Sequence, residues 1–429
     1  MKVKTSVTRN PRILILGLST LVSGTGNWIT MMAVLAMVVF RGTGGILESS
    51  AIFLAGLLPM LASSPAAGWL ADRYDRKKLM IVSESVAGLS VVGLVFTAEP
   101  VLIYGMLALQ AVFVSLMIPA RQAALPDLVA EHELTQANAF FQQLNGVVKI
   151  IAPMLAGFVL TVLTPHQAIL LDVLSFGVSA LILTRLPALH PQAIENPSGE
   201  EKPAPDTAQA ESALRMAFHL APSLKWLFIS IFLGITVIMG LDVLASVFIR
   251  DVLAETEQFY GIMVGLIGVG TFAATLILMF RRKAANPWHD LVAGIFLLSG
   301  IPAVMVVSAV WAPNADLART LVLAGSLLGG VGNGLLTVQM NTLLQTLSPR
   351  GLLGRLVGLY ETTAVAGQLV SVLLVPALVP GLMTMTLFLG VSSGMLVVVG
   401  TLILLKSRSL RDPREMPAAK AAHSLSQIG

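Results

Sequence analysis

The stretch Gly68-Trp-Leu-Ala-Asp-Arg-Tyr-Asp-Arg-Lys-Lys-Leu-Met80 decides the fold, because it is a short charged segment between two long apolar runs. The run 46–70 before it contains a single charge, Glu48, and the run 79–98 after it contains a single charge, Glu84. A loop with four cations and two anions cannot enter hydrocarbon, so it stays at one face of a membrane. Its neighbours are therefore expected to form an antiparallel pair of membrane-spanning helices.

The charges of this loop are open to two interpretations. Gly68 would allow close helix approach, and Asp72 lies where it could cap the next helix or pair across the loop. The cations that follow are Arg73, Arg76, Lys77 and Lys78. They form either the latch of a gate or a plain positive anchor on the inner side of a membrane.

The composition is that of an integral membrane protein. Of 429 residues, 55% are hydrophobic and 12% are charged, whereas a soluble domain has about 25% charged residues. The mean hydropathy is +0.84. The apolar runs are continuous rather than alternating, which predicts an all-α protein and not a membrane barrel.

The N-terminal residues Lys2, Lys4, Arg9 and Arg12 resemble the start of a signal peptide. The following run, 13–40, is too long for one, and we interpret it as an uncleaved first span. The pI near 9.4 reflects cations in loops beside apolar spans, so nucleic acid is not an expected partner. The chain has no cysteine and hence no disulfide framework or thiolate metal site.

Twelve runs have the length of a membrane span. They cover about 13–40, 46–70, 79–98, 100–120, 136–164, 166–186, 223–250, 258–280, 289–311, 317–343, 356–379 and 381–405. The segment between the halves is rich in Pro, Glu, Ala and Ser and predicts a flexible linker. The expected organisation is an N-terminal six-helix bundle (1–186), a cytoplasmic linker (187–222), a C-terminal six-helix bundle (223–406) and a cytoplasmic tail (407–429).

The distribution of positive charge predicts the orientation. If the N-terminus is inside, the inner segments hold 23 of the 27 Lys and Arg residues. The outer loops hold three, and Lys149 lies within a span. Both termini are therefore expected in the cytoplasm, with the protein in the cell (inner) membrane.

The loop resembles the signature between helices two and three of the major facilitator superfamily. The matching residues are Gly68, Asp72, Arg73, Arg76 and Lys77, whereas Asp75 replaces a second glycine that would permit positive φ. The segments Pro119–Val129 and Glu133–Ala139 resemble the connection of helices four and five in the macrolide-efflux and enterobactin-exporter branch. The resemblance covers nearly the whole chain and implies twelve helices in two pseudo-symmetric six-helix bundles.

Other features of that family are incomplete. The helix-five antiporter motif is present as Ala152-Pro153-Met-Leu-Ala-Gly157. The helix-four motif requires an arginine within the span, but Val101–Ile118 has none and only Gln110 is strongly polar there. The second-half copy of the loop is reduced to Arg281-Arg-Lys283.

Polar residues within the spans are candidate functional sites, because a charge at the bilayer centre costs at least about 2.5–3.5 kcal/mol. Asn138, Gln142, Asn145 and Lys149 recur at helical spacing and share one face of span five. This face is either the wall of a substrate and proton cavity or a structural surface in which Lys149 pairs with a neighbouring helix.

Asp242 in span seven and Asn27 in span one occupy the equivalent first helices of the two halves, which the resemblance places beside the central cavity. Asp242 is our leading candidate for a protonatable coupling group. The alternative is a carboxylate that is paired with Lys149 or solvated near the surface.

Further candidates for the cavity are Glu361 and Gln368 on span eleven, and Asn333 and Asn341, with Thr337 between them, on span ten. Hydrogen bonding between helices is the alternative for each. Glu84 and Asp172 lie on spans that the resemblance places at the periphery, so we interpret both mainly as structural.

No enzyme, cofactor or metal site is indicated. All six histidines lie in loops, tails or span ends. There is no Gly-Lys-Ser/Thr loop for ATP, and Gly329-Gly-Val-Gly-Asn-Gly334 lies in an apolar run where it suits helix packing.

The resulting prediction is a monomeric secondary transporter that exports an amphiphilic organic molecule, drug-like or siderophore-like, by exchange for protons through alternating access. Its expected partners are the small-molecule substrate, protons and membrane lipids. Transport of lipids or lysolipids, or uptake, is the alternative within transport. A non-transporting sensor or assembly factor is the alternative from another class.

Overall fold

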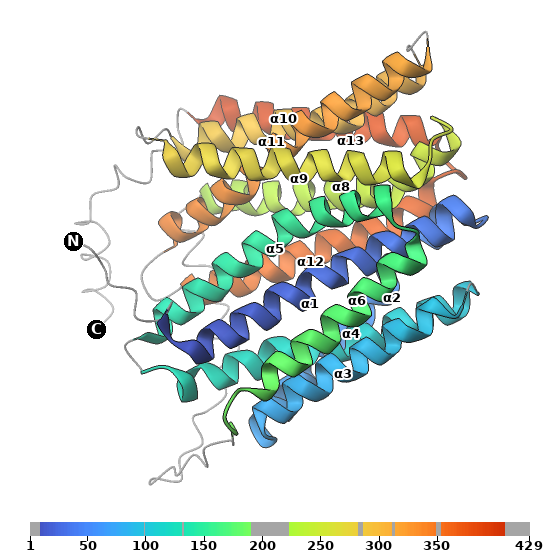
Figure 1. Cartoon of the computed structure of the whole chain (residues 1–429). Coiled ribbons are helices and arrows are strands. Elements are labelled where there is room, and N and C mark those ends of the chain that lie inside the picture. Colours follow the sequence, from blue (N-terminus) through green and yellow to red (C-terminus); the bar gives the residue numbers. More distant parts are fainter. Residues whose placement is uncertain are drawn as a thin grey trace, which may run out of the picture. The chain divides into compact units, whose positions relative to one another are not determined.

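The computed structural model describes residues 9–97, 99–130, 133–189, 223–281, 286–310, 314–348 and 353–407. This described part of the chain is helical and contains no strand (Figure 1). Its helices are α1 (Pro11–Leu35) with the π-helical continuation η2 (Ala36–Arg41), α2 (Ile46–Arg73), α3 (Arg76–Val95), α4 (Pro100–Leu128), α5 (Leu134–Val162), α6 (Pro165–Thr184), α8 (Ser223–Asp251), α9 (Glu257–Phe280), α10 (Pro287–Val310), α11 (Ala315–Leu347), α12 (Leu353–Leu378) and α13 (Met385–Ser407).

The twelve predicted spans are confirmed. Counting α1 with η2, the described residues contain 12 helices long and apolar enough to cross a membrane. The predicted linker and tail fall almost entirely in 190–222 and 408–429, outside the described residues.

Two helices continue well beyond their apolar runs. α4 extends to Leu128 and α11 to Leu347, whereas hydropathy predicts ends near 120 and 343. Hydropathy marks only the length of chain that fits hydrocarbon, but backbone hydrogen bonding continues into the interface. α4 therefore continues past the predicted span end near 120, and Arg121 and Asp127 are helical residues.

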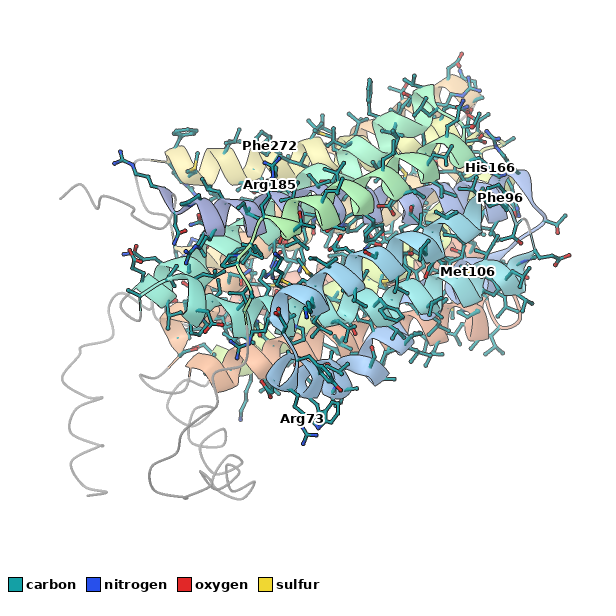
Figure 2. All side chains as sticks on the ribbon, turned by 60° about the horizontal axis from the view of Figure 1, so that its bottom comes forward. Arg73, Phe96, Met106, His166, Arg185 and Phe272 are labelled. Carbon is teal, nitrogen blue, oxygen red and sulfur yellow. The ribbon has the colours of Figure 1, made fainter. Side chains whose placement is uncertain are left out.

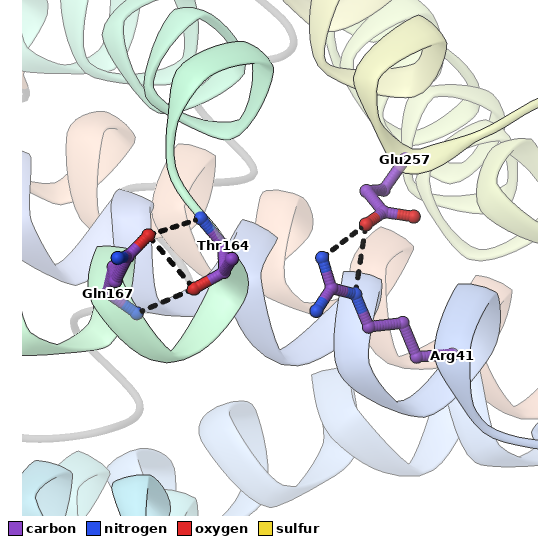
Figure 3. Close-up of polar contacts among 4 residues, drawn as sticks. All are labelled: Arg41, Thr164, Gln167 and Glu257. Carbon is purple, nitrogen blue, oxygen red and sulfur yellow. Dashed lines mark hydrogen bonds and ion pairs between the residues drawn. The ribbon is translucent and has the colours of Figure 1, made fainter.

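The sequence also explains where the helices begin. α1, α4, α6 and α10 each have proline as the first residue, a position at which its missing N–H costs no helical hydrogen bond. At α6 the Thr164 amide donates to Gln167 Oε1 at 2.9 Å, and the Gln167 amide donates to Thr164 Oγ1 at 3.4 Å (Figure 3). This reciprocal cap fixes the start of α6.

The described chain forms two compact units. The N-terminal unit contains α1 to α6 together with Val243–Gly268, which is the end of α8 and the start of α9. The C-terminal unit contains the beginning of α8 up to Asp242, α9 from Val269, and α10 to α13.

In the N-terminal unit, α1 packs on α5 and α6, while α4 packs on α2 and α3, and α3 also packs on α6. Figure 2 shows Phe96 and His166, at the end of α3 and the start of α6, at one end of this unit. Arg73 and Arg185, at the ends of α2 and α6, lie away from it. A cluster of buried apolar side chains joins all six helices near Ile13, Met80 and Leu125.

In the C-terminal unit, α10 packs on α11 and α13. The glycine-rich run 329–334 lies inside α11, as its apolar setting predicts. A Cβ atom on Gly332 would lie 2.7 Å from Gly294 O of α10. The run therefore allows close approach of two helices, a common device where packing drives association.

Candidate functional site

The 68–80 loop is shorter than the sequence predicts, because 68–73 end α2 and 76–80 begin α3, so that only Tyr74 and Asp75 lie outside a helix. The whole stretch is tied to two other helices of the N-terminal unit. Arg76 forms an ion pair with Asp127 of α4, and both side chains are only 13% exposed. Lys77 Nζ donates to the carbonyl oxygens of Thr184 at 2.7 Å and Leu186 at 2.5 Å, at the end of α6. A cation is favourable there because the last carbonyls of a helix carry partial negative charge.

Asp75 begins α3 as its N-cap. Its φ is −55°, and its side chain accepts a hydrogen bond from the Lys78 amide at 3.2 Å. The replacement of the family's glycine is thus accommodated without positive φ, since aspartate is a favoured N-cap residue. The capping role that the sequence suggested for Asp72 belongs to Asp75.

Asp72 is exposed, and no hydrogen bond or ion pair joins it to another described residue. The guanidinium of Arg73 stacks over Trp69 at 4.3 Å. No described atom lies within 4 Å of a Cβ built on Gly68. The anchor contacts of the loop thus come from Arg76 and Lys77, and a latch role for Gly68 and Asp72 stays a prediction.

The C-terminal unit has a reduced counterpart of this arrangement. Arg281 Nη1, at the end of α9, forms an ion pair with Asp290 Oδ2 of α10 at 2.7 Å. Gln339 of α11 donates to the same oxygen at 3.1 Å. Residues 282 and 283 of the predicted loop copy lie outside the described residues.

Two predicted cavity residues of the N-terminal unit are in contact. Gln110 Nε2 of α4 donates to Asn27 Oδ1 of α1 at 2.9 Å. Gln110 is buried, whereas Asn27 is exposed. The amide pair links α1 to α4 and leaves Asn27 accessible.

The polar face of α5 is accessible where its side chains are described. Asn138 and Lys149 are exposed and Asn145 is half-buried, while the side chain of Gln142 lies outside the description. Lys149 forms no ion pair with a described residue of its own unit. The alternative interpretation, a structural Lys149 paired with a neighbouring helix, is not observed among the described residues of that unit.

Arg121 is a site residue that the sequence analysis missed. It lies on α4 with 5% exposure, its Nη1 atom donates to Thr20 Oγ1 at 3.1 Å, and its guanidinium lies 4.8 Å from the Phe141 ring centre. No ion pair joins it to a described residue. Arg121 lies just past the predicted end of the span, and the apolar Ala120, Ala124 and Leu128 at four-residue spacing are the sign that α4 continues.

The helix-five motif lies at a tight crossing of α5 with the start of α9. Pro153 is inside α5. A Cβ atom on Gly157 would lie 2.1 Å from Gly261 O, and one on Gly261 would lie 2.6 Å from Gly157 O. Only glycine fits at both positions.

The end of α8 is bonded to the same unit. Arg250 Nη1 donates to the carbonyl oxygens of Val39 and Gly44, where η2 ends and the chain turns into α2. Arg41 Nη2 forms an ion pair with Glu257 Oε1 of α9 at 2.7 Å (Figure 3). These contacts hold the connection of α8 and α9 to α1, η2 and α2.

Among the predicted residues of the C-terminal unit, Asp242 on α8 and Glu361 on α12 are exposed, and Gln368 is half-buried. Asn333 Nδ2 donates to Thr271 Oγ1 of α9 at 3.3 Å. Asn341 Nδ2 donates to Thr337 O of its own helix at 2.9 Å. Asn333 therefore joins two helices, and Asn341 is exposed on α11.

Glu84 and Asp172 are buried at 3% and 0% exposure, in contact with α1. Their recorded hydrogen bonds come from neutral hydroxyl groups, and no described cation pairs with either. An unneutralised buried carboxylate costs several kcal/mol, more than the roughly 1–3 kcal/mol of one unpaired neutral donor.

Metal ligation is not indicated in the part of the chain that the structure describes. No three His, Cys, Asp or Glu side chains gather there as a metal ion would require.

Comparison with known proteins agrees with the twelve-helix architecture. The sequence profile of the Major Facilitator Superfamily matches residues 16–372. The enterobactin exporter EntS of Salmonella typhimurium is 30% identical over 372 residues, which cover 83% of this chain and 82% of EntS. The uncharacterised MFS-type transporter YfiS of Bacillus subtilis is 32% identical over 169 residues, which span 39% of this chain and 40% of YfiS.

Solved transporters share the fold at low sequence identity. A peptide transporter POT in complex with sulfate has a TM-score of 0.66 and 12% identity, covering 94% of this chain and 95% of that chain. A mutant of the nucleoside transporter NupG has a TM-score of 0.64 and 12% identity, covering 92% of this chain and 99% of that one. The profile match over most of the chain, the relatives and the twelve helices together establish that this multi-pass membrane protein is a transporter of the major facilitator superfamily.

Proposed function

We propose that this transporter exports an amphiphilic organic molecule in exchange for protons, by alternating access of its two halves. It acts as a monomer in the cell membrane, with both termini in the cytoplasm. The excess of Lys and Arg in the segments on the side of the N-terminus supports this orientation.

The observation that carries the proposal is the exposure of ionisable side chains inside membrane helices. Lys149 of α5, Asp242 of α8 and Glu361 of α12 are exposed, although each helix is long and apolar enough to span a bilayer. Exposure to lipid would cost at least about 2.5–3.5 kcal/mol per charge. Such groups commonly line a path for ions or substrate, and we assign Asp242 as the proton-coupling carboxylate.

The proposed substrate class and direction of transport are based on the similarity to EntS and on the composition of the predicted cavity residues. EntS is named as an exporter of enterobactin and matches this chain over most of its length. The remaining predicted cavity residues are amides, namely Asn27, Gln110, Gln142, Asn145, Asn333, Asn341 and Gln368. An apolar surface with a few polar groups suits an amphiphilic organic molecule.

Flux in proteoliposomes tests this function. A siderophore, a macrolide and a lysolipid are each added to vesicles that contain a pH-sensitive dye. We expect proton movement that depends on the siderophore or the macrolide. Proton-independent lysolipid movement would favour a lipid transporter, and no flux of any compound at normal protein incorporation would favour a sensor or assembly factor.

Two substitutions test the assigned residues. Asp242→Asn and Lys149→Ala should each slow proton-coupled transport at least tenfold, about 1.4 kcal/mol in the barrier, because each removes a charge from the path. Lys225→Ala, at an exposed cation in the first turn of α8, is the control and should transport normally. Normal transport by both test variants at normal expression would refute the assignment.

A further inference from the structure

The N-terminal unit contains a buried polar cluster apart from the residues assigned above. Glu84 of α3 and Asp172 of α6 both contact α1. Each lies within a few residues of the middle of a 20-residue helix. The cluster is therefore far from both ends of the spans.

The polar groups around the two carboxyls are hydroxyls. Thr30 Oγ1 donates to Asp172 Oδ2 at 2.6 Å, and Ser175 Oγ donates to Asp172 Oδ1 at 2.8 Å. Ser23 Oγ donates to Glu84 Oε1 at 3.2 Å. On the adjacent turn, the hydroxyls of Ser19 and Ser179 are 2.7 Å apart. Every partner is neutral, so the contacts leave the charge of the pair uncompensated.

One oxygen of the cluster has no partner. Glu84 Oε2 is buried and forms no hydrogen bond with a described residue, whereas both oxygens of Asp172 accept one. The charged groups on the same helices are distant: Arg76, Lys77 and Lys78 lie in the first turn of α3, and Arg185 follows the end of α6. Arg121 of α4 is buried beside α1, but it bonds to Thr20, three residues before Ser23, and forms no ion pair with Glu84. Asp172 is the ionisable group that acts electrostatically on Glu84.

The backbone makes room for this pair. A Cβ atom on Gly26 of α1 would lie 2.1 Å from Asp172 Oδ1 and 2.0 Å from Ser175 Oγ. α1 thus approaches α6 at the carboxyl group itself. One face of α1 contacts the cluster. It carries Ser19, Ser23, Gly26 and Thr30, which are spaced by four, three and four residues.

We propose that Glu84 is a proton-binding site, with the proton held on Oε2 while Asp172 remains a hydroxyl-bonded carboxylate. A proton needs one oxygen that accepts no hydrogen bond, and Glu84 Oε2 is such an oxygen. Two carboxylates that share a dry site do not both ionise. The two hydroxyl donors stabilise the charge on Asp172, so Glu84 is the member that takes the proton. The proposal does not involve Asp242 and does not depend on the direction or substrate of transport.

Infrared spectroscopy of the full-length protein in nanodiscs, without substrate, tests the site. The wild type should show a protonated-carboxyl band at neutral pH that is lost in Glu84→Gln, an isosteric change. Glu99→Gln, at the exposed N-cap of α4, is the control and should keep the band. Ser23→Ala removes the hydrogen bond to Oε1 and should shift the band without abolishing it.

Identical spectra of wild type and Glu84→Gln would overturn the proposal. If the band is lost in Asp172→Asn but not in Glu84→Gln, the proton is on Asp172, and the proposal is overturned as well. Thermal unfolding in sodium chloride and in choline chloride distinguishes a proton site from a sodium site. Sodium-dependent stabilisation that is lost in Glu84→Gln would refute a proton site in favour of a sodium site.

Discussion

At the scale of single residues, the charges of the 68–80 loop have different tasks. Arg76 and Lys77 bond to α4 and to the end of α6, and Asp75 begins α3. Asp72 remains exposed without a described partner. The two interpretations of the loop, anchor and latch, therefore concern different residues and can be tested separately.

Arg76→Ala should lower the free energy of unfolding by about 2–3 kcal/mol, because it leaves Asp127 without its cation. The value is somewhat below the 3–5 kcal/mol of a fully buried pair, since both side chains are 13% exposed. Thermal unfolding of the purified protein measures the effect. Lys78→Ala, at an exposed position of the same turn, should change the stability by less than about 0.5 kcal/mol. Equal effects of the two changes would rule out a structural role for the ion pair.

Asp72→Asn tests the latch. It should slow transport several-fold while leaving substrate binding and thermal stability unchanged, because the side chain bonds to nothing described in the N-terminal unit. Transport rate and binding affinity are measured on the same preparation. Unchanged transport would leave the loop as an anchor only.

Sequence patterns could identify some of these residues but not their surroundings. Lys149 was evident because a cation in an apolar run is rare. Arg121 was not, because it lies just beyond the run that hydropathy recognises. Glu84 and Asp172 were assigned to the periphery, and nothing in the spacing of either helix shows that α1 presents a face of hydroxyls to both.

At the scale of elements, the crossing of α5 and α9 leaves no room for a side chain on either helix. Gly157 and Gly261 bring two backbones into contact, and close backbone approach is a main source of attraction between helices in lipid. The same region holds Arg250 on the carbonyls of Val39 and Gly44. The antiporter-like motif of α5 thus acts as a packing surface in this structure.

Gly157→Ala should destabilise the protein by about 1–3 kcal/mol, the usual cost of overpacking, because the new methyl group would meet Gly261 O at 2.1 Å. Gly146→Ala on the same helix is the matched control, since no atom lies within 4 Å of its Cβ position. The control should be neutral or stabilising by up to about 1 kcal/mol, because alanine favours a helix over glycine. Thermal unfolding compares them, and a tolerated Gly157→Ala would contradict the tight crossing.

The helices can be predicted from the sequence, because the backbone of each span must form its hydrogen bonds within the span in hydrocarbon. The ends of the helices are predicted less accurately. α4 and α11 pass beyond their apolar runs to Leu128 and Leu347, where the boundary depends on contacts such as that of Asp127 with Arg76.

At the scale of the whole molecule, the sequence predicts the twelve-helix major facilitator fold, and the structure and the family match confirm it. The predicted division into two bundles rested on the composition of the linker. In the structure, the end of α8 and the start of α9 belong with α1 to α6. Hydropathy contains no information about such packing between helices that are far apart in the chain.

The central claim is that export is driven by proton exchange. Its most direct test measures proton and siderophore fluxes simultaneously in proteoliposomes, with and without an imposed pH gradient. The account predicts that protons move opposite to the substrate, that the gradient accelerates export, and that Asp242→Asn abolishes the proton flux. Substrate flux that is unaffected by the gradient and unaccompanied by protons would contradict it.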